Sequence, residues 1–490
     1  MSYWHTLAAI LAAASAGSFA STCSAAQMSD VEHIIVIYLE NHSFDNLFGF
    51  FPGADGIATA GATKIQVDAD GKPYDFLPRA MEMVDLPHDE EVDKRPSVDP
   101  LLSAIKKFNK RMSVDRRFPD NLPNQPFSID AYVPLGDKTG DPIHRFYHQQ
   151  AQIDGGLMDK FVAHTNVGAL VMGYYDGSRT NLWRYAERYT LADHFFQAAF
   201  GGSFLNHFWL ICACTPRYDN APDKLKAGSD VSGPLRGLPD QVTPDGYAVN
   251  TLQPFHEPHN EHQDMLPPQD MTTIGDELDA AKPEPVTWAW YSGGWDDAER
   301  GQADENFQYH HQPFAYFSKY APGKAGREHL KDAQKFLDLI EGKAGPEEKL
   351  PQVVFYKPIG DLNEHPGYAN VLEGDKRLGE LLGNIEKSPF WSKSVVIVTF
   401  DENGGFWDHV PPPKIDRWGP GTRVPTVIVS PYAKKGFIDH TIYDSTAILK
   451  LIEIRFGLEC LTDRDKNAKG LLNAFDFDGT PPNATCKPRP

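Results

Sequence analysis

The stretch "HIIVIYLEN", residues 33 to 41, decides the fold because a largely apolar run ends abruptly in Glu40 and Asn41. A second stretch of the same kind, "SVVIVTFDEN", occupies residues 394 to 403. Continuous rather than alternating hydrophobicity is typical of strands that are buried on both faces, as in a parallel or mixed sheet covered by helices. The two stretches therefore predict an α/β fold in which helices sandwich the sheet.

Further segments of both kinds follow along the chain. Apolar, β-rich runs predict strands at 286 to 292, 352 to 356 and 423 to 430. A helical pattern with a Ser cap predicts a helix over 178 to 189, and an apolar stripe after an Asp predicts another over 444 to 456. The alternation of strands and helices supports the α/β class.

Length and charge limit what the chain can be. Its 490 residues permit roughly two to four domains. Strands occur on both sides of the polar segments at 82 to 125 and 216 to 272, so we expect one domain over 27 to 490 with these two segments as insertions. The formal net charge of −20 argues against a nucleic-acid or anionic-membrane partner, because both reward clustered Lys and Arg.

The N-terminus predicts export. The segment "LAAILAAASAGSFASTCSAAQ" has an apolar core followed by small residues, so residues 1 to 26 resemble a signal peptide despite the absence of Lys and Arg in "MSYWHT". Cys23 as a lipoprotein site is the less favoured alternative, since the usual Leu before the small pair is absent. No later stretch is long and apolar enough to span a bilayer. We expect a periplasmic or secreted protein.

Four cysteines remain after such processing, an even number that suits an oxidising compartment. Cys460 and Cys486 are positioned to staple the C-terminal tail. Cys212 and Cys214, in "ICACTP", lack the spacing and the His pair of a zinc site. For this second pair, buried thiols and a strained disulfide both remain open.

Polar residues follow two of the predicted strands at the place where ligands bind in α/β sheets. Glu40 and Asn41 end the first, and Asp401 and Glu402 end the second. Adjacent carboxylates repel one another unless a cation or proton intervenes, and a hard divalent ion accepts both carboxylate and amide oxygens. Capping of a following helix, or glycosylation of Asn41, would explain one pair alone. Two matched strand ends favour a metal site.

A serine among glycines is the candidate nucleophile. In "AAFGGSFLNHFW", Ser203 follows two glycines and precedes a helix-like segment, whose N-terminal amides would stabilise an anion. Gly201 fits the nucleophile elbow G-x-S-x-G, but Leu205 stands where the second Gly should be, so a serine esterase is disfavoured. A simple N-cap role for Ser203 is the alternative.

Histidines gather in irregular segments next to Pro, Gly or Asp. They are His144, His310, His311, His365 and His409. A single histidine is usually a surface residue or a hydrogen-bonded core residue, but several in loops suggest a shared polar pocket. Imidazoles ligate metals, and imidazolium ions bind phosphate oxygens and protonate leaving groups.

Five motifs together closely resemble the bacterial phosphoesterase family, which contains phosphocholine-specific phospholipases C and the acid phosphatase A enzymes. The resemblance extends from about residue 31 to residue 458, and its motifs are "EHIIVIYLENHSFDNLFG", "LADHFFQAAFGGSFLNHFW", "NEHPGY", "TFDENGGFWDHVPPP" and "GPGTRVPTVIVSPYAKKGFIDHTIYDSTAILKLIE". Ser203 in "GGSFLNH" resembles the acid phosphatase branch, whereas the phospholipase branch typically has Thr there.

The resemblance implies an alkaline-phosphatase-like core of mixed or parallel sheet between helices, and a phosphoserine intermediate on Ser203. The residues that match the family's metal ligands are Glu40, Asn41, Asp401 and Glu402. The residues that match those around the transferred phosphoryl group are His144, His311 and His365. His310 is a possible substrate-binding residue, because one sequence leaves the register of the His pair open. Asp408 and His409 belong to a motif and are expected only to shape their loop.

The predicted function is hydrolysis of small phosphate monoesters by a divalent metal ion and Ser203. The metal would lower the pKa of the Ser203 hydroxyl, and protonated histidines would favour acid pH. A phospholipase C that cleaves phosphodiester head groups is the alternative, and a binding protein without turnover is a remote one. Calcium, magnesium, manganese and zinc all suit these oxygen ligands.

Overall fold

A single mixed sheet of eight strands organises the chain. The computed structural model describes residues 26–61, 65–85, 110–228, 240–259, 263–478 and 484–488. The strand order of the sheet is β11-β10-β12-β1-β13-β14-β6-β15. Its strands are β1 (His33–Leu39), β6 (Thr190–Ala192), β10 (Trp288–Ser292), β11 (Leu330–Asp332), β12 (Val353–Lys357), β13 (Ser394–Phe400), β14 (Thr426–Val429) and β15 (Phe437–Asp439).

The predicted strands are all present in this sheet. β1 and β13 have the predicted bounds and pair in parallel, with Ile35 opposite Val396. β12 also runs parallel to β1. β14 is antiparallel to both of its neighbours. It begins three residues later than predicted because Pro425 has no N–H to give to the ladder. The prediction of a buried mixed sheet is therefore confirmed.

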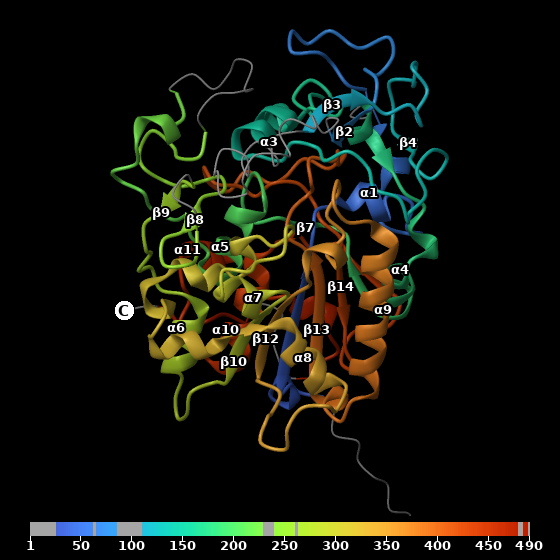
Figure 1. Ribbon diagram of the computed structural model, residues 1–490. Helices are drawn as coiled ribbons and strands as arrows, with labels where there is room; N and C mark the ends of the chain where they lie inside the picture. The colour runs from blue at the N-terminus through green and yellow to red at the C-terminus, as the bar shows by residue number, and fades with distance from the viewer. Residues whose placement is uncertain are drawn as a thin grey trace, which may run out of the picture.

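Helices cover both faces of the sheet (Figure 1). α9 contacts both α4 and α8 on one face, and α5 and α10 contact each other on the opposite face. The helices are α1 (Phe44–Phe48), α3 (Phe146–Ile153), α4 (Asn181–Arg188), α5 (Ser203–Cys212), α6 (Ile274–Ala280), α7 (Trp295–Glu299), α8 (Ala333–Ile340), α9 (Val371–Lys387), α10 (Thr446–Phe456) and α11 (Asp463–Asn467).

Both predicted helices exist, with one corrected cap. α4 starts after Thr180, whose hydroxyl accepts a hydrogen bond from the Trp183 amide. Ser178, the predicted cap, instead lies in a short 3₁₀ turn in which its own amide donates to Asp176. α10 starts at Thr446, and the Asp444 carboxylate accepts a hydrogen bond from the amide of Thr446. A polar side chain therefore binds free amide groups at the start of each helix.

The two insertions form small elements outside the main sheet. The part of the first insertion that the structure describes includes an antiparallel pair, β2 (Met81–Asp85) with β3 (Lys110–Val114). The second insertion includes the short pair β8 (Gln253–Pro254) with β9 (Met265–Leu266). The short pairs elsewhere are β4 (Phe127–Ser128) with β5 (Gly173–Tyr174), and β7 (Phe195–Phe196) with β16 (Tyr443–Asp444). The predicted single-domain organisation stays a prediction.

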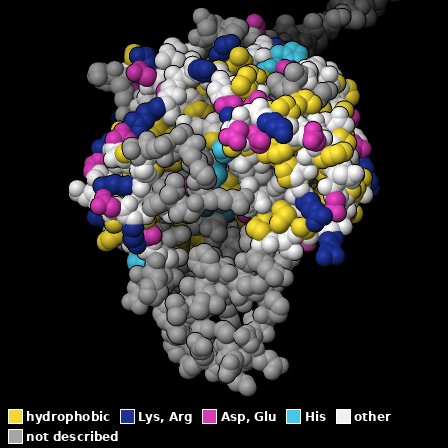
Figure 2. Space-filling view, turned by 90° about the horizontal axis from the view of Figure 1, so that it is seen from above, with side chains coloured by type: hydrophobic (Ala, Val, Ile, Leu, Met, Phe, Trp, Pro, Cys, Tyr) yellow, Lys and Arg dark blue, Asp and Glu magenta, His cyan; other side chains and the backbone are white. Residues whose placement is uncertain are grey.

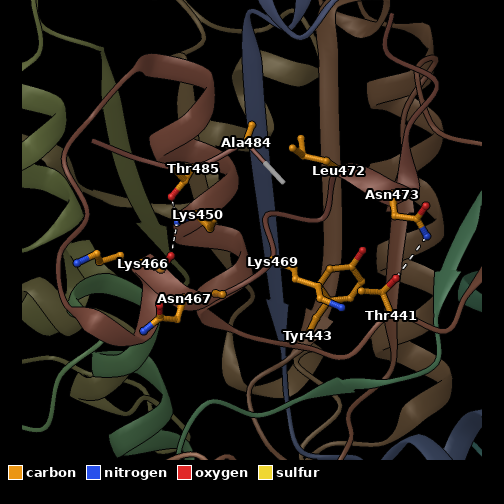
Figure 3. Close-up of a pocket in the computed structure, with 11 residues that line it drawn as sticks. Thr441, Tyr443, Lys450, Lys466, Asn467, Lys469, Leu472, Asn473, Ala484 and Thr485 are labelled. Carbon is orange, nitrogen blue, oxygen red and sulfur yellow. Dashed lines mark hydrogen bonds between the residues drawn. The ribbon is translucent and has the colours of Figure 1, made fainter. Parts of the chain in front are cut away.

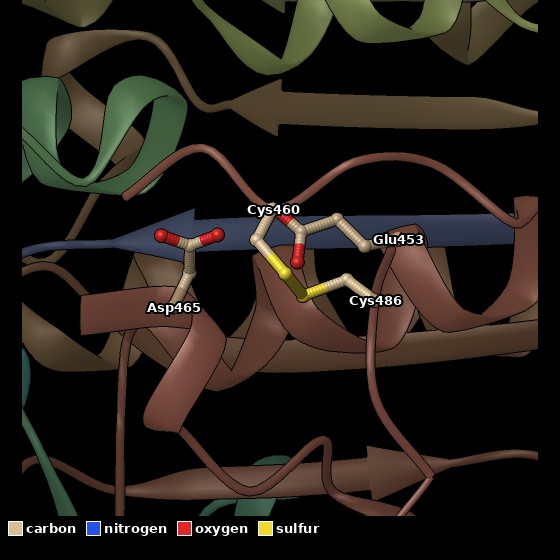
Figure 4. Close-up of side chains that lie close together, drawn as sticks. All are labelled: Glu453, Cys460, Asp465 and Cys486. Carbon is tan, nitrogen blue, oxygen red and sulfur yellow. A yellow bond between two sulfur atoms is a disulfide. The ribbon is translucent and has the colours of Figure 1, made fainter. Parts of the chain in front are cut away.

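The proposed signal peptide lies almost entirely outside the described residues, as do 86–109 of the first insertion and 229–239 of the second. Within the described part of the chain, no helix combines the length and the apolar character that crossing a membrane requires. Cys460 joins Cys486, as predicted for the C-terminal staple (Figure 4). Cys212 joins Cys214, so of the two alternatives for that pair, buried thiols and a disulfide, the structure has the disulfide.

Candidate active site

The carboxyl ends of β1, β12 and β13 meet at the upper end of the sheet in Figure 1, close to α1 and α3. Glu40 and Asn41 follow β1, Asp401 and Glu402 follow β13, and Lys357 is the last residue of β12. None of these five side chains is more than 1 % exposed. The structure therefore brings the two polar strand ends together.

Ser203 faces this cluster from the first turn of α5. Its Oγ lies 3.4 Å from Asn41 Oδ1 and 3.3 Å from Glu402 Oε1. Gly201 lets the backbone before Ser203 approach the backbone at Phe146 closely, because its φ is +89° and a Cβ there would lie 2.5 Å from the amide nitrogen of Phe146. Since α5 begins at Ser203, the free amides of its first turn also point toward this place.

The three carboxyl groups of the cluster titrate abnormally. Burial raises the pKa of Asp401 well above its usual range, and the charges of Glu40 and Glu402 raise it further. Burial likewise raises the pKa of Glu402, with Glu40 adding to the effect. Burial would also raise the pKa of Glu40, but His311 and Lys357 hold it well below its usual range. Lys357 lowers the pKa of Asp401 but does not offset burial and the two neighbouring carboxylates, which leaves a deficit of positive charge near Asp401 and Glu402.

A divalent metal ion fits that deficit. Two oxygens bound about 2.3 Å from one ion and at a right angle to each other lie about 3.3 Å apart, which is the spacing of Ser203 Oγ from its two neighbours. Among the described residues, Asp401 Oδ2 has no hydrogen-bond donor although it is fully buried. Asn41, Asp401, Glu402 and Ser203 together offer the oxygen donors that a hard cation prefers.

Glu40 is engaged differently from the other predicted ligands. Its Oε1 lies 2.6 Å from Lys357 Nζ and also pairs with His311 Nε2. Its Oε2 accepts a hydrogen bond of 3.0 Å from the Tyr368 hydroxyl. The sequence interpretation overlooked Lys357, although a charged residue that closes the apolar run "QVVFYK" is the same signal that marked Glu40.

Two of the predicted histidines stand at the mouth of the site with fixed ring orientations. His144 Nδ1 donates to the Pro142 carbonyl at 2.6 Å, and His365 Nδ1 donates to the Pro366 carbonyl at 2.6 Å. The Nε2 of His144 lies 3.3 Å from Asn41 Nδ2 and 3.6 Å from Glu402 Oε1. Because the carbonyl fixes the proton on Nδ1, Nε2 is the atom that each ring presents to the site.

The structure places the two adjacent histidines differently. His310 lines the cavity, whereas His311 lies behind the cavity and pairs with Glu40. His207, which the sequence interpretation did not select, packs against both rings and donates from Nδ1 to the Ser203 carbonyl at 2.8 Å. Its position four residues after Ser203 on a helix would have revealed it. Burial lowers the pKa of all three rings.

The site opens into a cavity of about 460 Å³. Histidine side chains are visible in a narrow opening near the middle of the face shown in Figure 2. The lining includes polar groups from several separate segments, among them Asp141, Arg145, Asn166 and Gln308. A larger cavity of about 750 Å³ lies beside α10 and α11 (Figure 3), but its lining contains no carboxylate, histidine or serine.

Asp408 and His409 shape a loop, in line with their predicted role. His409 Nδ1 lies 2.6 Å from Asp45 Oδ2, and Arg423 Nε donates to Asp408 Oδ1 at 2.8 Å. Arg423 is fully buried and also donates to Asp45 Oδ1 at 3.1 Å. These bonds tie the segment after β13 to α1, so that both polar strand ends are held in place.

Comparison with known proteins identifies the family of the chain. A model of the phosphoesterase family matches residues 31–459. The chain belongs to the phosphoesterase family. This confirms the resemblance inferred from the motifs, and it makes the protein a phosphoester hydrolase of a typically metal-dependent kind.

Similar relatives carry the name phospholipase C. Phospholipase C A of Mycobacterium tuberculosis is 24% identical, over 94% of this chain and 79% of the relative. The non-hemolytic phospholipase C of Pseudomonas aeruginosa is 22% identical, over 88% of this chain and 54% of the relative. A Vibrio parahaemolyticus protein of the alkaline phosphatase superfamily has 10% identity and a TM-score of 0.30, with 64% and 68% of the two chains covered. That TM-score is too low to bear on function.

Proposed function

We propose that the protein hydrolyses phosphate monoesters through a phosphoserine intermediate on Ser203. The observation that carries this proposal is the position of the Ser203 hydroxyl, 3.3 to 3.4 Å from Glu402 Oε1 and Asn41 Oδ1 and at the N-terminus of α5. A hydroxyl that faces oxygen ligands and helix amides can attack phosphorus while the amides stabilise the phosphoryl oxygens.

Asn41, Asp401 and Glu402 would hold a divalent metal ion beside Ser203. When bound, this ion supplies the positive charge that favours the serine alkoxide and neutralises the phosphoryl group. The Nδ2 of Asn41 faces His144 Nε2 at 3.3 Å, which turns its Oδ1 toward Ser203. The chain therefore positions the nucleophile before the substrate arrives, and phosphoryl transfer requires mostly such positioning.

The histidines would handle the substrate's charge and the leaving group. His144, His310 and His365 line the cavity around Ser203. Protonated His144 and His365 would bind phosphoryl oxygens and give a proton to the departing alcohol, whereas burial lowers the pKa of His310, which would act as a neutral hydrogen-bonding group. Water would then attack the phosphoserine from the face that the alcohol left. A reaction that uses protonated histidines should be fastest at acid pH.

Two observations support monoesters as the substrate class. The nucleophile is Ser203, as the resemblance to the acid phosphatase branch implies. The cavity is lined mostly by polar groups, and its aromatic side chains are Phe204 and Tyr368, with Tyr368 stacked on His365. A choline head group is usually bound within a cage of several aromatic rings. These two rings do not make such a cage among the described lining residues.

Hydrolysis of phospholipid head groups is the second candidate, because the relatives reported above are named phospholipases C. Rates on p-nitrophenyl phosphate and p-nitrophenylphosphorylcholine separate the two. We expect the monoester to be the better substrate by kcat/KM, with an optimum below neutral pH. A higher kcat/KM on the phosphorylcholine ester would favour the phospholipase C instead. If Ser203→Ala kept its activity on both esters, the Ser203 nucleophile would be wrong for both candidate functions.

A further inference from the structure

A cavity larger than the one at Ser203 lies elsewhere in the molecule. It has a volume of about 750 Å³ and is bordered by α10, by the end of α11 and by the segment at Ala484 and Thr485 (Figure 3). None of its lining residues also lines the cavity at Ser203. The proposed reaction therefore does not use this second cavity.

Lysines are the charged residues of this lining. They are Lys450, Lys466 and Lys469, and no carboxylate accompanies them among the described lining residues. Another cavity, of about 540 Å³ beside β11, is also lined by three lysines, but three glutamates line it as well. The charges of that cavity can cancel, whereas those of the cavity beside α10 cannot. On a chain with a net charge of −20, a concave surface with an excess of positive charge attracts anions.

Lys450 is the buried lysine of the three. It is 1 % exposed, and its Nζ donates to the Lys466 carbonyl at 2.7 Å, to Thr485 Oγ1 at 2.8 Å and to Cys486 Sγ at 3.0 Å (Figure 3). All three acceptors are neutral, and Lys450 forms no ion pair with a described residue. Burying an ammonium without an ion pair is costly, so a bound anion would offset part of that cost.

The acids close to Lys450 do not balance its charge. Burial lowers the pKa of Lys450, and the opposing influence of Glu453 and Asp465 does not make up for it. Glu453 is itself protonated at ordinary pH, because burial raises its pKa to about 10. Asp465 directs its two carboxylate oxygens to the amides of Leu461 and Thr462. Lys450 therefore contributes an unbalanced positive charge to the cavity wall.

Lys466 and Lys469 are exposed residues of the lining. Lys466 Nζ has one weak pairing, at 3.8 Å from Asp463 Oδ1, and exposed pairs of this kind contribute little. Lys469 forms no ion pair with a described residue. Two further ammonium groups are therefore available to a ligand in the cavity.

The lining on the side of β15 covers the one acid that lies behind it. Asp439 is fully buried and accepts hydrogen bonds from the Tyr443 hydroxyl at 2.8 Å and from Asn473 Nδ2 at 2.8 Å. Tyr443 and Asn473 line the cavity, and Asp439 does not. Ala468 and Leu472 add apolar surface to the same lining. The cavity therefore combines positive charge with aromatic and apolar surface.

We propose that this cavity is a second binding site, for a small organic anion that carries two or more negative charges and an apolar or aromatic part. Its volume of about 750 Å³ lies within the range of small-ligand pockets, about 300 to 1,000 Å³. Inorganic phosphate would leave most of this volume empty, so the ligand is a larger molecule. The site does not include Ser203, and the inference does not depend on the proposed function.

Binding of a fluorescent polyanion tests the proposal. The probe is hydroxypyrene trisulfonate, an aromatic dye with three sulfonates, which a phosphoester hydrolase cannot cleave. The full chain is added to the dye at low salt, and fluorescence anisotropy reports the bound fraction. We expect one saturable site per chain, with an affinity that falls as salt is added, because salt screens the attraction between the lysines and the sulfonates.

Two double variants provide the contrast, and both alter the net charge of the chain equally. Lys466→Gln with Lys469→Gln removes two exposed charges from the cavity beside α10 and should weaken dye binding at least about tenfold, because two of the three attracting charges are lost. Lys335→Gln with Lys349→Gln removes two exposed charges from the cavity beside β11, where glutamates balance them, and should leave the affinity unchanged.

Thermal denaturation gives a second readout, since a ligand that binds only the native state stabilises it. The dye should raise the Tm of the wild type and of the Lys335/Lys349 variant more than that of the Lys466/Lys469 variant. The proposal would be overturned by the absence of saturable binding to the wild type, by undiminished binding to the Lys466/Lys469 variant, or by equal losses in the two double variants. These outcomes would leave the proposed function standing.

Discussion

Two groups of buried carboxyl groups in this chain have contrasting surroundings. In the candidate active site, Glu40, Asp401 and Glu402 face a lysine, a serine and an open cavity. Beside α11, Glu453 and Asp465 lie against the Cys460–Cys486 disulfide (Figure 4). Glu453 is fully buried and does not line any described cavity, while Asp465 accepts hydrogen bonds from the amides of Leu461 and Thr462.

The contrast shows that burial of acids does not by itself make a site. Burial, helped by Asp465, raises the pKa of Glu453 to about 10, so this carboxyl group is neutral at ordinary pH and needs no cation. In the active site, the ammonium of Lys357 keeps one carboxylate charged, and oxygens around a nucleophile are left to bind a metal. A serine hydroxyl within hydrogen-bond distance and access from solvent distinguish the functional group from the structural one.

The largest expected effect is that of Ser203→Ala. Removal of the nucleophile should lower kcat on p-nitrophenyl phosphate by at least about a thousandfold, because the covalent step is lost. Ser292→Ala is the matched control, because Ser292 is buried like Ser203. It lies at the end of β10, and its hydroxyl has no hydrogen-bond partner among the described residues. We expect near-normal kcat for the control, and equal losses in both variants would indicate a structural cause.

A smaller effect is expected when one of the unsatisfied oxygens is changed. Asp401→Asn keeps the shape and removes the charge, so it should weaken metal binding by at least about 100-fold, given that changes outside the ligand shell already cost 10- to 100-fold. Competition with a chelator measures this affinity. Asp465→Asn, in the structural group, should leave metal affinity unchanged, and if it did not, the contrast between the two groups would be wrong.

The smallest effect concerns stability and pH. Folding raises the pKa of Glu453 above its unfolded value of 4.5, so the native state keeps a proton that the unfolded state releases, and stability is lost as pH rises from 4.5 toward 10. Glu453→Gln carries no such proton. It should therefore be more stable than the wild type at pH 8, by up to about 1.4 kcal/mol for each pH unit above 4.5, and the difference should vanish below pH 4.5.

Chemical denaturation at several pH values measures that difference. Glu347→Gln, at an exposed glutamate, should show the wild-type pH dependence. If Glu453→Gln were less stable than the wild type at pH 8, Glu453 would be ionised in the native state, and the group beside α11 would need a cation after all.

Much of the site could be predicted from the sequence because strand ends are local signals. The apolar runs before Glu40 and Asp401 fix two parallel strands, and parallel neighbours bring their carboxyl ends to one edge. The glycines before Ser203 mark a close approach of backbone to backbone, which the positive φ of Gly201 bears out. These features depend on a few consecutive residues, so a single sequence contains them.

The remaining features depend on contacts between distant segments. Whether His310 or His311 faces the cavity is set by how a 3₁₀ turn packs against α5, which no local pattern encodes. The pairing of Lys357 with Glu40 depends on the order of β12 and β1 in the sheet. Thr180 rather than Ser178 caps α4, because a turn fixed by Asp176 holds Ser178 outside the helix. Pairings of this kind require the three-dimensional structure.

The most direct test of the account is to trap the intermediate. The full chain is mixed with a phosphate monoester at acid pH and quenched with acid within the first turnovers, and its peptides are examined by mass spectrometry. The account predicts one phosphoryl group on the peptide that contains Ser203, attached to Ser203 itself and absent in Ser203→Ala. A phosphoryl group on a histidine instead, or undiminished turnover without any labelled serine, would contradict it.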